Sequence, residues 1–233
     1  MDKPLESSLH FDLETVSPSE MLLAIQLHCS QIANELSDVE SPSVSVKISG
    51  ARGQDFIGAG FRDIAEVAVQ GAIGDFGFCS FGDGECRVEG NVGDFFGHSI
   101  ASGVLLVRGH AKKAVGALGA GGLISIYGNA GDRTALGMQG ADVVIRGSVG
   151  SYAGLGMQSG TLVVCGSAGK QLGQGMCGGA IYIRGEAESI SSNIEEQRLR
   201  EPDRLKIGML LLKSDIKSAG KEFRLFRPVR EEV

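Results

Sequence analysis

The sequence contains no tryptophan, only five prolines in 233 residues, and no apolar run that approaches the length of a membrane-spanning helix. The scarcity of proline excludes collagen and Pro-Gly-rich disorder, although glycine is abundant at 36 residues. Basic residues are outnumbered, 22 against 28 acidic ones, so the net charge of −6 has the wrong sign for a general nucleic-acid or anionic-membrane binder. These features predict a soluble protein with a packed core.

The cysteines and the first residues indicate the compartment. The five cysteines include no C-x-x-C pair, and their odd number argues against a disulfide framework. The opening residues, Met1 to Glu6, lack the basic and then apolar pattern of a signal peptide. We therefore expect a reducing, cytoplasmic location.

What is present is a period of 19 residues without an insertion. Seven structural glycines carry it: Gly71, Gly90, Gly109, Gly128, Gly147, Gly166 and Gly185. Six residues before each of them lies a second column of glycine or alanine. Glycine at such corners permits a positive φ or the close approach of a neighbouring chain segment. A repeat of this length is one supersecondary unit that stacks on its copies.

Between the two glycine columns, each repeat alternates like a strand. The residues at the two inward positions are Val67, Cys86, Leu105, Ile124, Val143, Leu162 and Ile181, and then Val69, Val88, Val107, Ile126, Ile145, Val164 and Ile183. Apolar and mostly β-branched columns are typical of strands that bury one face. Helical solenoids, leucine-rich repeats and calcium-binding rolls need other templates. We therefore predict an all-β fold, a right-handed parallel β-helix with 19-residue coils and short flanking helices.

Three parts of the chain are predicted on this basis: a helical cap over 1–43, the β-helix over 44–190, and a helical or extended tail over 191–233. Ser17, Pro18 and Glu20 predict a capped helix that runs to about Asp38. Val44, Val46 and Ile48 predict a first, imperfect coil that ends at Gly50. The tail is helical in pattern over 191–218, and its apolar segment 223–228 is expected to dock on the rod or on a partner.

We find no catalytic, cofactor-binding or metal-binding set. The four histidines are scattered, and a zinc site needs three or four convergent ligands. The segment from Gly173 to Gly178 matches G-x-G-x-x-G, but a strand follows it where a dinucleotide site needs a helix. Met138, Met157 and Met176 are 19 residues apart and are expected to stack as a core column. We expect this chain to bind no cofactor of its own.

The outward side of the strands offers a candidate protein interface. It consists of an apolar column bordered by arginines: Leu106, Val144, Val163 and Tyr182, with Arg108, Arg146 and Arg184. An apolar patch with an arginine border is typical of a permanent interface. The alternative is that a terminal segment of the same chain covers this face, and the sequence does not separate the two.

The coils Ile145 to Gly154 and Val164 to Gly173 repeat G-x-x-G-x-x-x-G after a short apolar strand. In this they resemble the GXGXG family, which includes the C-terminal β-helix of the glutamate synthase large subunit and free-standing subunits built from it. The resemblance covers about 44–187, and the coil at Gly109 departs from it with Lys112 in place of the second glycine. In that family the β-helix is architectural and supplies no catalytic side chain.

The resemblance implies a non-catalytic subunit of a glutamate-synthase-like complex of the N-methylglutamate synthase type. The implied partners are a glutamine-amidotransferase-like subunit and a synthase-like subunit that binds FMN. One alternative is the scaffold C subunit of formylmethanofuran dehydrogenase or of the related formyltransferase/hydrolase complex. Another is a self-assembling rod, although charged terminal segments would cap such a stack.

Overall fold

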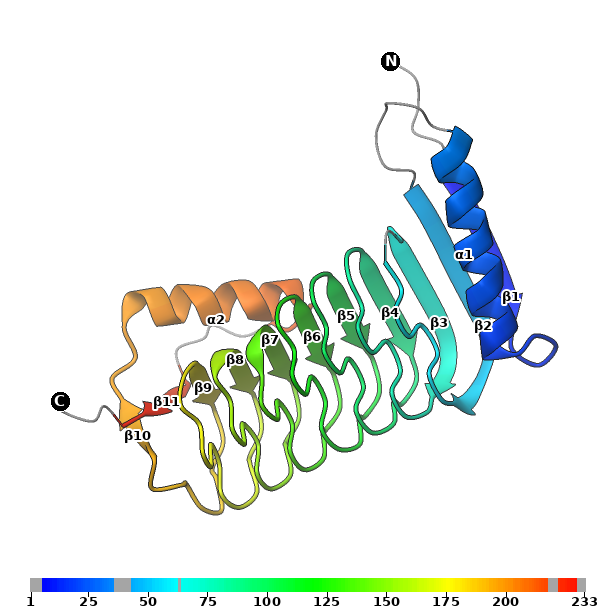
Figure 1. Ribbon diagram of the computed structural model, residues 1–233. Helices are drawn as coiled ribbons and strands as arrows, with labels where there is room; N and C mark the ends of the chain where they lie inside the picture. The colour runs from blue at the N-terminus through cyan, green and yellow to red at the C-terminus, as the bar shows by residue number, and fades with distance from the viewer. Residues whose placement is uncertain (1–5, 36–42, 63, 218–221, 230–233) are drawn as a thin grey trace.

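The computed structural model describes residues 6–35, 43–62, 64–217 and 222–229, and it shows a rod of stacked coils (Figure 1). The seven repeat strands are β3 (Glu66–Ile73), β4 (Glu85–Glu89), β5 (Val104–Val107), β6 (Leu123–Ile126), β7 (Gln139–Ile145), β8 (Ser159–Val164) and β9 (Ala180–Ile183). Each pairs in parallel with the next, so that Val67 lies opposite Cys86 and Leu162 opposite Ile181. The chain climbs one rung for every 19 residues, and the predicted β-helix is confirmed.

The interior of the rod is filled by the predicted apolar columns. Their side chains are buried in every coil, with no more than 1% of the surface of any of them exposed. The methionine column is buried as well, with Met138 and Met157 fully enclosed. Phe78, Phe81 and Phe96 fill the same space in the earlier coils, where their rings meet edge to face. The rod is therefore a continuous core rather than a channel.

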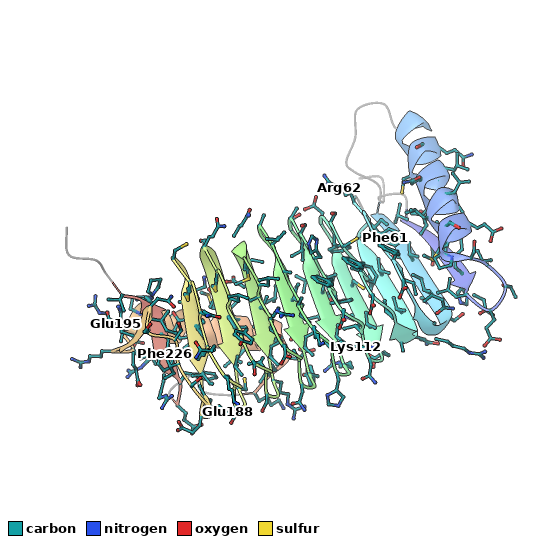
Figure 2. The ribbon with its side chains drawn as sticks, turned by 60° about the horizontal axis from the view of Figure 1, so that its bottom comes forward. Phe61, Arg62, Lys112, Glu188, Glu195 and Phe226 are labelled. Carbon is teal, nitrogen blue, oxygen red and sulfur yellow. The ribbon has the colours of Figure 1, made fainter. Side chains whose placement is uncertain are left out.

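The turns repeat as regularly as the strands. In each coil, three residues spaced by two have a left-handed backbone, as in Phe95, Gly97 and Ser99 with φ of 57°, 66° and 55°. The coil with Lys112 keeps this conformation at its corresponding residues, so the missing second glycine does not change the turn. Figure 2 shows Lys112 and Glu188, which occupy the same repeat position, on the same long edge of the rod.

Glycine occupies the two columns for different physical reasons. The glycines of the preceding column need the backbone freedom of glycine, since they have a positive φ, which is 80° at Gly103, whereas the alanines of this column do not. Gly147 in the period column does not have a positive φ. A Cβ there would collide with Asn129 Oδ1 and lie 2.6 Å from the carbonyl oxygen of Gly128. Close approach between coils explains this glycine.

Polar side chains link the turns of successive coils. Asp75 Oδ1 accepts a hydrogen bond from the backbone N–H of Asp94 at 2.8 Å, and Asp94 Oδ1 does the same for Lys113 at 2.8 Å. A second series includes His110, whose Nδ1 accepts from the N–H of Asn129 at 2.9 Å. These contacts satisfy corner N–H groups that the strand ladders leave unpaired.

The first end of the rod is built from β1 (Glu6–Asp12), α1 (Pro18–Glu35) and β2 (Ser43–Gln54) (Figure 1). The predicted capped start of the helix is confirmed, because Ser17 Oγ donates to Glu20 Oε2 at 2.7 Å and accepts from the Glu20 N–H at 3.3 Å. The strand β2 continues past Gly50, where we expected it to end, with a register shift beside β3. The prediction that the helix reaches Asp38 falls outside the described residues. We did not predict β1, which is the outermost strand.

The second end contains β10 (Ile194–Gln197), α2 (Glu201–Lys213) and β11 (Arg224–Pro228). β11 lies between β9 and β10 and is antiparallel to both. The apolar segment therefore docks on the rod, which was one of the two expected outcomes. Phe226 belongs to the core of the coils and lies near the β10 end of the rod, where Figure 2 labels it. The helical pattern predicted over 191–218 is correct for α2 and wrong for β10.

Candidate interaction surface

The apolar face predicted as a partner interface is covered by the chain itself. Val144 and Val163 are fully buried, and Tyr182 and Leu106 are 2% and 8% exposed. Figure 1 shows α2 running beside β7, β8 and β9, and residues of α2 and the tail cluster with Val144, Val163 and Tyr182. The interface prediction is thus corrected for these four side chains, because all four are buried, and for these three the expected alternative of cover by a terminal segment is what the structure shows.

The covered face and the tail form a second hydrophobic core outside the coils. From α2, the buried residues Ile207, Leu210 and Leu211 pack into this cluster with Val144 and Val163. The tail also supplies Ile216, Phe223 and Leu225 to the cluster. In β11, Leu225 therefore faces the second core while Phe226 faces the first.

A buried carboxylate anchors the start of α2. Asp203 is 7% exposed and accepts hydrogen bonds from Tyr182 Oη at 3.0 Å, from Arg227 Nη2 at 2.7 Å and from the backbone N–H of Arg200 at 2.9 Å. Burial by itself would raise the pKa of Asp203, but these hydrogen bonds and the Arg227 charge outweigh it and lower the pKa. Burial raises the pKa of Tyr182 to about 12, and its bond to Asp203 acts in the same direction.

We expect Asp203→Asn to destabilise the protein by about 2 kcal/mol at pH 7, since the charge-assisted bonds to Tyr182 and Arg227 are weakened. A lowered carboxyl pKa means that this stabilisation is present above the usual value near 3.9 and is lost as the pH falls through the lower folded value. The difference between wild type and variant should therefore shrink below about pH 4 in thermal unfolding. Glu201→Gln, which removes an exposed carboxylate from the same helix, is the control. A difference that stays constant from pH 7 to pH 3 would contradict this role of Asp203.

The predicted arginine border has intrachain contacts. Arg108 forms an ion pair with Asp215 at 3.1 Å, and its guanidinium lies 4.3 Å from the ring centre of Tyr127. Arg146 lies 5.1 Å from the same ring, and Tyr127 Oη donates to the carbonyl oxygen of Asp215 at 2.6 Å. These contacts attach the residues after α2 to the rod.

The remaining polar contacts lie farther along this face. Arg184 Nε donates to the carbonyl oxygen of Cys165 at 2.9 Å. Lys206 of α2 lies 3.3 Å from Asp142 Oδ1. The three predicted arginines stay exposed, but Arg108 and Arg146 no longer border a free apolar patch.

The sequence also matches the model of a known family. The model of the GXGXG motif family covers residues 28–209, most of the chain. The chain belongs to the GXGXG family. No curated protein matches this GXGXG chain.

The coils of this GXGXG protein place no cluster of ligating side chains together. Among the described residues, no group of three or more His, Cys, Asp or Glu side chains is arranged to hold a metal ion. Cys86 is buried, and burial raises the pKa of its thiol well above the usual range. The G-x-G-x-x-G segment leads into β9, a strand, as its position in the repeat predicted. Neither described helix is long and apolar enough to cross a membrane.

Two apolar features at the surface of the GXGXG chain were not predicted from the sequence. The first is the outer side of α2, where Leu205, Met209 and Leu212 are exposed. The second is a ladder of phenylalanines on the turns: Phe56 stacks on Phe76 with ring centres 5.4 Å apart, and Phe76 on Phe95 at 4.9 Å. The 19-residue spacing of Phe76 and Phe95 was a visible signal for the ladder. The spacing of the leucines on α2 was a signal too, but it did not say which side of the helix would be covered.

Proposed function

We propose that the chain is a non-catalytic structural subunit of a cytoplasmic glutamate-synthase-like complex of the N-methylglutamate synthase type. It holds a glutamine-amidotransferase-like subunit and an FMN-dependent synthase-like subunit in fixed relation, and the FMN belongs to the latter. The family match over 28–209 is the observation that carries this proposal.

The physical character of the rod supports the same role. Its interior is occupied along its length by its own apolar columns, so the surface that meets other molecules is the outside. Strand ladders and side-chain bonds join each coil to the next, as between Asp75 and Asp94. A stack held together in this way resists bending and keeps two bound partners at a set separation.

The two ends of the stack favour a subunit over a self-assembling rod. α1 packs Met21 and Ile25 into the core at the first end. At the second end, β11 lies antiparallel on β9 and is followed by the four-residue edge strand β10, so the 19-residue coils do not continue beyond β9. A rod that grew by stacking copies would need an open coil at each end.

The test is reconstitution with recombinant partners from the same organism. The chain is mixed with an amidotransferase-like and an FMN-dependent synthase-like protein, and complexes are measured by size-exclusion chromatography with light scattering. We expect a ternary complex, with glutamine-dependent nitrogen transfer raised above that of the two partners without the chain. Failure of the chain to bind either partner, or binding to formyltransferase-type partners instead, would overturn the proposal.

A further inference from the structure

The outer side of α2 is apolar although it faces solvent. Leu205, Met209 and Leu212 are 60%, 59% and 78% exposed, and their spacing of four and three residues places them in one stripe. The opposite side of the same helix is buried in the second core. A helix with apolar side chains on both sides is typically packed against other segments on both sides.

Gly208 lies beside this stripe, in the interior of the helix. Glycine is unfavourable there, and a Cβ at this position would meet no atom within 4 Å. No contact in the described chain therefore requires glycine at 208. A glycine on an exposed helix face lets another backbone approach closely.

The stripe continues into a depression at the end of α2. A groove of about 470 Å³ is lined by Gly208, Leu212, Asp215, Ile216 and Lys217. The stripe and the groove together, which we name the α2 outer face, give an elongated apolar surface of the kind that receives an amphipathic helix.

The charges around the α2 outer face determine what fits it. Arg204 lies on one flank of the stripe and Lys206 and Lys213 on the other, while Lys217 lines the groove. Two of these basic residues pair within the chain, Arg204 with Glu201 at 3.7 Å and Lys206 with Asp142 at 3.3 Å, and Asp215 pairs with Arg108 at 3.1 Å. Among the described residues, no ion pair involves Lys213 or Lys217, so the charges of these two lysines are not balanced. The surface is locally basic on a chain with a net charge of −6. A second copy would bring basic flanks together, whereas a partner with acidic flanks is complementary.

We propose that the α2 outer face is the docking site for an amphipathic helix with acidic flanks, carried by a partner subunit. This inference rests on the proposed function and deepens it. The sequence predicted the partner surface on the outward face of the strands. We infer that it lies instead on the outer side of α2, the helix that covers those strands. Leu205, Met209 and Leu212 anchor the partner helix, and its acidic residues meet Lys213 and Lys217.

The first test uses the full chain and synthetic helical peptides of about 20 residues. One peptide has leucines at three- and four-residue intervals flanked by glutamates, and a second has lysines in place of the glutamates. By fluorescence anisotropy, we expect the glutamate peptide to bind at least roughly tenfold more tightly than the lysine peptide. Leu212→Asp should weaken this binding by at least roughly tenfold. Equal binding of the two peptides would overturn the proposal.

Two variants make this test specific. Leu23→Asp alters a leucine of α1 that is 58% exposed, and binding should not change. Gly208→Ala should raise the melting temperature by about 2–4 °C through helix propensity, and still weaken peptide binding because the added methyl group obstructs close approach. Unchanged binding by Leu212→Asp, or a wild-type dimer that this substitution dissociates, would contradict an acidic partner helix.

A second measurement separates this inference from the proposed function. Wild type and Leu212→Asp are each mixed with the recombinant amidotransferase-like and FMN-dependent synthase-like subunits. Loss of one partner from the variant alone supports both proposals. If the two proteins bind both partners equally, the α2 outer face is wrong and the proposed function stands. If wild type binds neither subunit while the peptide results hold, the proposed function is wrong and the docking face stands for another partner.

Discussion

Gly147→Val is expected to prevent stable folding of the coils around it. The valine Cβ would collide with Asn129 Oδ1 and lie 2.6 Å from the carbonyl oxygen of Gly128, both in the preceding coil. The backbone carbonyl cannot move without breaking the bond that it accepts from the Gly147 N–H at 3.0 Å. We expect a loss of about 3 kcal/mol or more in the free energy of unfolding, measured by urea denaturation.

Gly208→Ala is the matched control for this variant. It also adds a side chain to a glycine without a positive φ, but at a position with no atom within 4 Å. This change should stabilise the isolated chain by up to about 1 kcal/mol. If Gly147→Val were as harmless as Gly208→Ala, the coils would not be as closely stacked at this column as the structure describes.

The coils could be predicted because the repeat reports the same environment many times. Each inward position recurs in every coil, and a position that is apolar in all of them, such as that of Val67 and Ile181, must face the core. The period itself sets the register, since an unbroken 19-residue spacing leaves one way to stack the strands. The reason for each glycine column was less accessible. Whether a glycine serves φ or close approach depends on the neighbouring coil.

The ends of the rod and the covered face were harder to predict because they occur once. β1 pairs directly with β2, although α1 separates the two strands in the sequence. β11, near the end of the chain, inserts between β9 and β10. Neither pairing leaves a repeated pattern in the sequence. The outward position of Val144 and Val163 was predicted correctly, but their burial depends on α2, which begins about 40 residues after Val163 and about 60 after Val144. Sequence patterns show that a face is apolar and do not show which segment covers it.

Val163→Asp is expected to detach the tail from the rod. The side chain of Val163 is fully buried in the second core, so a carboxylate there would lose its hydration without gaining a hydrogen-bond or ion-pair partner. We expect a cost of about 4 kcal/mol, which the protein reduces by releasing the cover rather than by unfolding the coils. Amides of α2 should lose hydrogen-exchange protection first, whereas those of β4 and β5 keep theirs.

Ala68→Asp is the control, because Ala68 occupies the same outward column in a coil that the second core does not include. It should change the stability by less than about 1 kcal/mol and leave the exchange of α2 unaltered. Equal hydrogen-exchange protection of α2 in the two variants would contradict the packing of the helix on this face. If the partner docks on α2, Val163→Asp should also weaken partner binding, although Val163 itself does not reach the surface. Leu212→Asp should weaken the same binding with α2 still in place. Hydrogen-exchange protection of α2 in the two variants therefore distinguishes detachment of the helix from loss of the side-chain contact on it.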